Sequence, residues 1–192
     1  MSLKTAANED KSRTNILNKA LFLDRDGVIN LDHGYVYQSD QFEFIPGIFN
    51  LGREALRKGY RIFVITNQAG IARGFYSEAE FLSLTDWMCA VFLANGVDIA
   101  KVYFSPFHPT AGIGEYLKDD YSRKPNPGMI MSARDDFDIN LENSILIGDK
   151  RSDIEAGILA GIGVNLLYDP DRKNEDDILQ IYSLEEALTY LK

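Results

Sequence analysis

Leu21-Phe22-Leu23-Asp24-Arg25-Asp26-Gly27-Val28-Ile29-Asn30 is the stretch that decides the fold of this 192-residue chain. An apolar run leads into two carboxylates one residue apart and then a glycine. Such a run predicts a buried strand of a parallel sheet. Its polar end places Asp24 at the carboxyl edge of that sheet, where open α/β sheets bind ligands. In extended backbone Asp24 and Asp26 share one face, and Gly27 permits a sharp turn after them.

The two carboxylates need a cation or a proton between them, because like charges this close repel each other. Magnesium is a hard cation that prefers oxygen ligands, so the pair predicts a magnesium site. The alternative is an ordinary Asp-Gly turn that closes a hairpin.

Composition bounds the class of protein. Hydrophobic residues make up 45% of the chain, which suits one α/β domain with a full core. No apolar stretch approaches the roughly 20 residues of a membrane span. Residues 1–18 are polar and lack the apolar region of a secretory signal, so we expect a flexible N-terminal arm before a single domain over 19–192.

The net charge and the cysteine content limit which cellular compartment and which classes of partner are expected. Cys89 is the single cysteine; it cannot form an internal disulfide, which favours the cytoplasm. A formal charge of −9 argues against a nucleic-acid partner. We expect a monomer that binds neither nucleic acid nor membrane.

Apolar runs alternate with segments of helical pattern along the chain. The expected strands are 20–23, 61–66, 99–104, 144–149 and 162–167. The expected helices are 46–58, 77–92, 126–137, 151–160 and 183–191, the second and last each opened by a capping box. The alternation predicts a doubly wound parallel sheet with helices on both faces, a Rossmann-like α/β fold. No connection between these elements has room for a separate cap domain.

Polar side chains follow four of the expected strands or lie in the loops after them. They are Asp24 and Asp26, Thr66 and Asn67, Arg123 and Lys124, and Asp149 and Asp153. In a parallel sheet these ends meet at one edge, and together they supply what phosphoryl transfer needs. One carboxylate can attack phosphorus, a second can move the leaving-group proton, and a magnesium ion can bridge carboxylates and phosphate oxygens. Lysine and polar donors can neutralise the equatorial oxygens.

Each group also has an ordinary structural explanation. Thr66-Asn67 could be a turn or a helix cap, and Lys124 could be a solvated loop charge. Asp149 could cap a helix, and Asp153 could be a first-turn acid that complements the helix dipole. The order and spacing of all four groups argue against coincidence. The two histidines, His33 and His108, lack partners at metal-ligand spacing and are expected to be non-catalytic.

The sequence resembles the haloacid dehalogenase-like phosphatase superfamily. The motifs that carry the resemblance are Asp24-Arg25-Asp26-Gly27, Thr66-Asn67-Gln68, Arg123-Lys124-Pro125, and Gly148-Asp149-Lys150 with Asp153. It is more similar still to one family, the D-glycero-D-manno-heptose 1,7-bisphosphate 7-phosphatases and the related histidinol-phosphatase domain. The loops 32–36, 66–74 and 123–129 look like those of that family, and the similarity runs from about residue 20 to about residue 165.

The resemblance implies a role for each matching residue. Asp24 matches the nucleophile and a magnesium ligand, and Asp149 matches the remaining carboxylate ligand. Asp26 matches the general acid/base, whose backbone carbonyl also binds magnesium, and Lys124 matches the lysine that bridges nucleophile and phosphoryl group. The expected substrate-binding residues are Thr66, Asn67, Arg73, Arg123 and Lys150. Asp153 matches a supporting position.

The function that the resemblance implies is removal of the 7-phosphate of heptose bisphosphate through an aspartyl phosphate, with Mg²⁺ as cofactor. This step belongs to heptose supply for bacterial surface polysaccharide. Alternatives are a histidinol-phosphate phosphatase, a phosphoacceptor signalling domain and an inactive scaffold. In a phosphoacceptor domain the accepting acid ends the third strand, where this chain has Ser105. The complete polar set argues against a scaffold.

One departure from the family concerns zinc. Many members carry cysteines and a histidine in the loop before Arg-Lys-Pro, and the corresponding positions here are Ser105, Phe107, Asp120 and Ser122. Zinc needs thiolate or imidazole ligands in a tetrahedral set, so we expect no zinc. The loop is expected to fold by packing of Phe107, Tyr116 and Tyr121.

Overall fold

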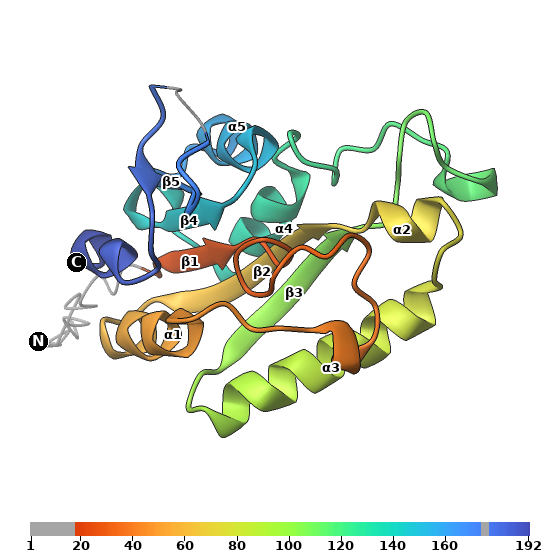
Figure 1. Ribbon diagram of the computed structural model, residues 1–192. Coiled ribbons are helices and arrows are strands. Elements are labelled where there is room, and N and C mark those ends of the chain that lie inside the picture. Colours follow the sequence, from red (N-terminus) through yellow and green to blue (C-terminus); the bar gives the residue numbers. More distant parts are fainter. Residues whose placement is uncertain (1–17, 174–176) are drawn as a thin grey trace, which may run out of the picture.

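Six parallel strands form one sheet in the order β3-β2-β1-β4-β5-β6 in the computed structural model, which describes residues 18–173 and 177–192 (Figure 1). The strands are β1 Ala20–Leu23, β2 Arg61–Asn67, β3 Ile99–Ser105, β4 Ile145–Gly148, β5 Val164–Tyr168 and β6 Gln180–Ile181. All five strand pairings are parallel. The predicted N-terminal arm lies outside the described residues except for Asn18.

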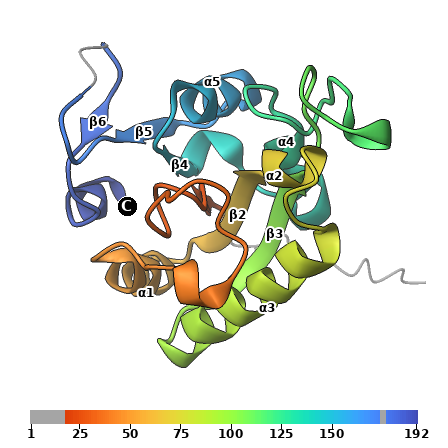
Figure 2. The same ribbon diagram turned by 45° about the vertical axis from the view of Figure 1, so that its right-hand side comes forward.

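Helices cover both faces of the sheet (Figures 1 and 2). One layer holds α1 Ile48–Arg57, α3 Glu78–Ala94 and the 3₁₀ helix η4 Glu186–Tyr190, and the other holds α4 Gly128–Phe137 and α5 Arg151–Ala160. The short helix α2 Ala69–Ala72 and the 3₁₀ turns η1 Ser39–Gln41, η2 Gly114–Tyr116 and η3 Leu141–Asn143 lie in connections. No helix of the described ranges is long and apolar enough to cross a membrane. The predicted doubly wound fold is confirmed.

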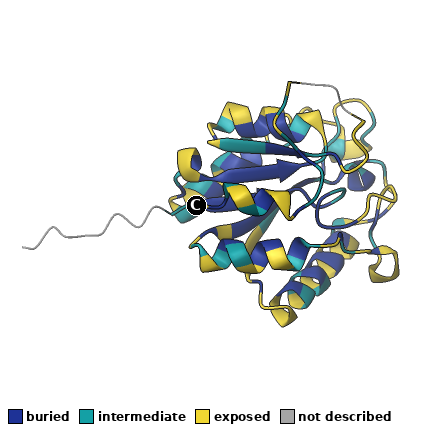
Figure 3. Ribbon diagram, turned by 60° about the vertical axis from the view of Figure 1, so that its left-hand side comes forward, coloured by how far each residue is buried: buried dark blue, intermediate teal, exposed yellow. Residues whose placement is uncertain are grey.

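Strand β1 shows why the sheet is buried on both sides. Leu21 and Leu23 pack into the core on the α1 and α3 side, whereas Ala20 and Phe22 pack into the core on the α4 and α5 side. All four residues are fully buried, as alternation of side chains across a central strand requires. Figure 3 shows the same pattern, with buried strands between helices whose outer faces are exposed.

Local predictions hold where a capping motif or a long apolar pattern supports them. The capping box of α3 is present, with Ser77 Oγ accepting from the N–H of Glu80 and the Glu80 carboxylate accepting from the N–H of Ser77. By contrast, α4 has Pro127 at its cap and begins at Gly128, two residues after the start of the expected helix 126–137.

Three local predictions are wrong. The segment 66–74, expected to be a loop, contains α2, and the two-residue strand β6 was not predicted. The last segment is a 3₁₀ helix rather than an α-helix, and its predicted capping box does not form. The carboxylate of Glu186 accepts from the N–H of Tyr182, and the N–H of Glu186 donates to the main-chain oxygen of Ser183 rather than to its hydroxyl.

We predict that Leu146→Ala lowers the free energy of unfolding by about 2–5 kcal/mol, because it leaves a cavity beside a central strand. Leu146 is 0% exposed on β4, whereas Leu93 is 65% exposed on α3. The control Leu93→Ala removes the same atoms from the surface and is expected to change stability by less than about 0.5 kcal/mol. Urea titrations followed by circular dichroism measure both. Similar losses in the two variants would contradict the core described here.

Candidate active site

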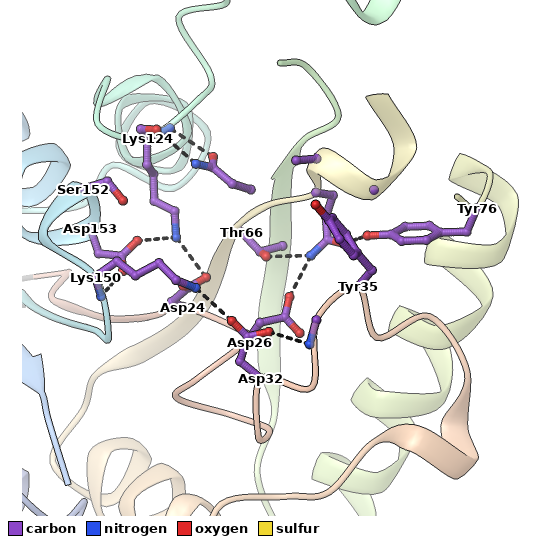
Figure 4. Close-up of a pocket in the computed structure, with 15 residues that line it drawn as sticks. Asp24, Asp26, Asp32, Tyr35, Thr66, Tyr76, Lys124, Lys150, Ser152 and Asp153 are labelled. Carbon is purple, nitrogen blue, oxygen red and sulfur yellow. Dashed lines mark hydrogen bonds and ion pairs between the residues drawn. The ribbon is translucent and has the colours of Figure 1, made fainter. Parts of the chain in front are cut away.

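The carboxyl edge of the sheet holds a cavity of about 350 Å³ (Figure 4). Asp24 comes directly after β1, and its N–H still donates to the carbonyl oxygen of Ile147 on β4, at 3.0 Å. Chain order changes direction between β1 and β4, and such a switch point is where doubly wound sheets bind ligands. Of the residues predicted from the sequence, the cavity is lined by Asp24, Asp26, Thr66, Asn67, Lys124, Lys150 and Asp153.

Lys124 lies at the centre of the site. Its ammonium Nζ lies 2.9 Å from Asp24 Oδ1 and 2.6 Å from Asp153 Oδ1, and it donates to the carbonyl oxygen of Ile65 at 2.9 Å. The residue is only 4% exposed. Burial disfavours the charge on Lys124, but Asp153 and Asp24 outweigh that effect and raise its pKa. The lysine is therefore a fixed positive charge that touches the predicted nucleophile.

Three carboxylates gather beside this lysine. One oxygen each from Asp24, Asp149 and Asp153 lies within 4.8 Å of the others. Burial raises the pKa of Asp24, Lys124 opposes this shift, and Asp153 and Asp149 add to it. Burial also raises the pKa of Asp149, and its Oδ1 is buried with no hydrogen-bond partner among the described residues.

This donor set fits magnesium. Lys124 contacts two of the three carboxylates, and Lys150 Nζ lies 3.4 Å from Asp149 Oδ2. The buried Asp149 Oδ1 still lacks a donor among the described residues, so a divalent cation with a preference for oxygen would supply the missing positive charge. Asp24 and Asp149 are in the set as the sequence predicted. Asp153, expected to play a supporting part, contributes the third carboxylate, and the carboxylate of Asp26 is not in the set.

The carboxylate of Asp26 is held by other donors. Arg25 reaches it through Nε at 3.1 Å and Nη2 at 2.8 Å, Asn30 donates through Nδ2 at 3.1 Å, and Gln68 donates through Nε2 at 3.2 Å. Arg25 is 1% exposed, and its Nη2 also donates to the carbonyl oxygen of Val36. Sequence reasoning missed these three donors, although each stands in or beside a motif that it had singled out.

The predicted phosphate-binding pair is split between two tasks. Thr66 is buried at the end of β2 and lines the cavity. Asn67 pairs with the main chain of Lys124, donating to its carbonyl oxygen and accepting from its N–H, each at 3.0 Å. The amide of Asn67 therefore fixes the loop that carries the lysine.

The remaining predicted substrate-binding residues are Lys150, Arg73 and Arg123. Lys150 lines the cavity and donates to Asp32 at 3.0 Å; burial disfavours its charge, but Asp149 and Asp32 outweigh that effect and raise its pKa. Arg73 and Arg123 do not line this cavity and lie beside it, Arg73 after α2 and Arg123 next to Lys124. Burial and the nearby charge of Arg73 lower the pKa of Arg123, and Arg73 Nε is buried with no hydrogen-bond partner in the described ranges.

The loop expected to lack zinc is closed by hydrogen bonds. Ser122 Oγ bonds Ser105 Oγ at 3.0 Å and Asp120 Oδ1 at 2.7 Å, which links the two ends of the loop. The ring of Phe107 packs near that of Tyr116, as predicted. Tyr121 was expected to fill the loop, and this is wrong, because it is 61% exposed. Two hydroxyls, one carboxylate and a phenyl ring do not fit zinc.

Comparison with known proteins identifies the family. The HAD-hydrolase-like family model matches residues 121–183. The chain is 56% identical over 150 residues to the D-glycero-α-D-manno-heptose-1,7-bisphosphate 7-phosphatase of Burkholderia mallei, covering 78% of this chain and 79% of that protein. It is 44% identical over 174 residues to the enzyme of the same name from Campylobacter jejuni, covering 91% and 96%. The chain belongs to the heptose-bisphosphate phosphatase family of HAD-like hydrolases. It is thus a phosphomonoester hydrolase, as predicted.

Solved structures support the fold. A HAD-like phosphatase from Mesorhizobium loti, described as putative, superposes with a TM-score of 0.83 at 31% identity, covering 91% of this chain and 86% of that one. The D,D-heptose 1,7-bisphosphate phosphatase of B. bronchiseptica, solved with magnesium and phosphate, superposes with a TM-score of 0.75 at 24% identity, covering 90% and 97%. The second comparison concerns the fold alone.

We predict that Mg²⁺ stabilises chelator-treated protein by about 2.7 kcal/mol at a concentration 100 times its Kd, because only the folded chain assembles the three carboxylates. Asp149→Asn is expected to lose most of this gain. The control Asp135→Asn, which changes an exposed acid paired with Arg134 on α4, is expected to keep it. Thermal denaturation with and without Mg²⁺ measures the effect. An undiminished gain in Asp149→Asn would place the metal elsewhere.

A second prediction concerns zinc. Elemental analysis of untreated protein is expected to find no stoichiometric zinc, and Mg²⁺ alone is expected to restore activity after chelation, because the loop closes through Ser105, Asp120 and Ser122. Tightly held zinc whose removal disorders residues 105–122 would contradict this interpretation.

Proposed function

We propose that this chain is a magnesium-dependent phosphatase that removes the 7-phosphate of D-glycero-D-manno-heptose 1,7-bisphosphate in heptose supply for surface polysaccharide. Relatives that are 56%, 49% and 44% identical bear this activity in their names. The observation that carries the proposal is a lysine-bridged carboxylate pair beside a second cluster of positive side chains. The chain acts as a monomer in the cytoplasm, as one capless domain over 19–192, without a nucleic-acid or membrane partner.

Asp24 is the nucleophile. Both hydrogen bonds that the described residues give it fall on Oδ1, from the N–H of Arg25 at 2.7 Å and from Lys124, so Oδ2 keeps its lone pairs for phosphorus. Attack forms the Asp24–phosphorus bond and breaks the bond from phosphorus to the sugar oxygen. Lys124 offsets negative charge on the phosphoryl oxygens, and the hydroxyl of Thr66 donates a hydrogen bond to them. A bound magnesium ion, held by Asp24, Asp149 and Asp153, would neutralise further negative charge there.

Asp26 moves the proton. It lines the same cavity as Asp24, and in the first step its carboxyl gives a proton to the departing sugar oxygen. In the second step the resulting carboxylate takes a proton from water, whose oxygen attacks phosphorus and releases phosphate from Asp24. Arg25, Asn30 and Gln68 supply donors to that carboxylate.

A bisphosphate needs a second anion site, and the loops beside the cavity offer one. Arg73 follows α2, Arg123 precedes Lys124, and His108 follows β3. Burial and the charges of Arg123 and Arg73 lower the pKa of His108. Its Nδ1 accepts from the N–H groups of Thr110 and Ala111, so the two arginines supply the positive charge here. The buried Nε of Arg73 has no partner in the described part of the chain. A phosphate would balance this concentration of positive charge.

The test is phosphate release from a panel of sugar phosphates that includes both anomers of heptose bisphosphate, with histidinol phosphate alongside. We expect the highest kcat/KM for a heptose bisphosphate, with loss of the 7-phosphate identified by NMR. Arg73→Gln is expected to raise KM for the bisphosphate more than for the corresponding monophosphate. Preference for histidinol phosphate would overturn the proposal, and a single stoichiometric phosphorylation without turnover would favour a phosphoacceptor domain.

We predict that Asp26→Asn lowers kcat/KM for a sugar phosphate by about 10²-fold or more while leaving substrate binding intact, because an alkoxide leaving group needs a proton. Asp24→Asn is expected to abolish turnover, since an amide is a poor nucleophile. Steady-state kinetics, with circular dichroism to verify folding, measures both. A near-normal rate in either variant would show that its role is assigned wrongly.

A further inference from the structure

Gln68 connects two residues of the proposed site. Its Nε2 donates to Thr66 Oγ1 at 2.8 Å and to Asp26 Oδ2 at 3.2 Å, and its Oε1 accepts from the hydroxyl of Tyr76 at 2.6 Å. Gln68 is 1% exposed and Tyr76 is 5% exposed. We propose that Gln68, oriented by Tyr76, is a positioning residue that holds Asp26 and Thr66 for phosphoryl transfer. The proposal rests on the roles given to those two residues above.

The Gln68 amide faces Asp26 and Thr66 with its NH₂ group and the Tyr76 hydroxyl with its oxygen. In the second step, when Asp26 is a carboxylate, it only accepts hydrogen bonds, so this orientation suits it. Burial raises the pKa of Tyr76 to about 12, so its hydroxyl keeps the hydrogen that it donates to that oxygen. Without this donor the amide could rotate, and its oxygen would then face the Asp26 carboxylate.

The same amide sets the direction of the Thr66 hydroxyl. Because Thr66 Oγ1 accepts from Gln68, its own hydrogen is left to donate elsewhere. Thr66 lines the cavity, where a phosphoryl oxygen would be the acceptor. One buried amide thus acts on the proton carrier and on a phosphate donor together.

The ring of Tyr76 is held so that its hydroxyl has a fixed place. It stacks on Tyr37 with ring centroids 5.2 Å apart and an angle of 10° between the planes. On α2, a Cβ at Gly70 would collide with the Tyr76 ring, so the glycine makes room for it. Tyr76 itself lines the cavity, and Figure 4 shows its hydroxyl pointing toward the group of side chains that includes Thr66.

The test compares Tyr76→Phe, which removes only the hydroxyl, with Gln68→Met, which keeps the size of the side chain and removes its polar atoms. Each variant is assayed with two substrates. One is an alkyl phosphate that the wild type hydrolyses, and the other is 4-nitrophenyl phosphate, whose leaving group departs without a proton. We expect Tyr76→Phe to lower kcat/KM about tenfold for the alkyl ester and less than about threefold for the aryl ester. The matched control Tyr37→Phe removes a hydroxyl from the stacked ring and is expected to change neither value.

A double variant supplies a measurement that does not depend on the leaving group. If the two residues act as one unit, Tyr76→Phe combined with Gln68→Met is expected to be no slower than Gln68→Met alone. Fully additive losses, or equal losses on alkyl and aryl esters in Tyr76→Phe, would overturn the proposal. Failure of the proposed heptose substrate would be visible in the wild type alone, so the two outcomes are distinguishable.

Discussion

The ammonium group of Lys124 is the contact on which the carboxyl edge of the sheet depends. It joins the residue after β1, the main chain of β2 and the first turn of α5, through Asp24, Ile65 and Asp153. Removing one partner of such a buried set leaves an uncompensated charge, which typically costs about 3–5 kcal/mol. The fold and the chemistry are therefore coupled, since the same charge that would meet a phosphoryl group also fixes three elements.

Close approach of backbone to carboxylates makes this arrangement possible. Gly27 has φ of +97°, and a Cβ there would collide with the carboxyl group of Asp149. At Gly148 a Cβ would collide with Asp153. Each glycine lets a carboxylate lie against main chain, so the acids converge where larger residues would hold them apart. Repulsion among the converged acids is what makes the site selective for a cation.

The sequence predicts most of this architecture because long apolar runs and capping motifs are local signals. The strands from β1 to β5 and the capping box at Ser77 follow from them. Helix α2 has only four residues and contains Gly70. Such a short segment with a glycine has the pattern of a turn, and it was therefore predicted as a loop. The donors Arg25 and Gln68 were missed as site residues because their role depends on which side chains meet across the sheet edge, a tertiary fact that spacing does not encode. Ligand chemistry predicts that the loop over 105–122 binds no zinc, but it did not predict the contacts that close this loop.

Those closing contacts help to place Arg123, which we propose as a substrate-binding residue. Ser122, bonded to Ser105 and Asp120, stands immediately before Arg123 and Lys124. Arg123 in turn donates to the carbonyl oxygen of Phe107 at 3.0 Å, so the arginine is tied back to the start of the same loop. A neutral hydrogen bond such as Ser122–Ser105 contributes about 1 kcal/mol, and one that involves a charged group, such as Asp120 or Arg123, about 1.5–3 kcal/mol; each is far less than a structural zinc ion contributes. The loop therefore relies on several weak contacts acting together, and its order is inseparable from the position of the second positive cluster beside the cavity.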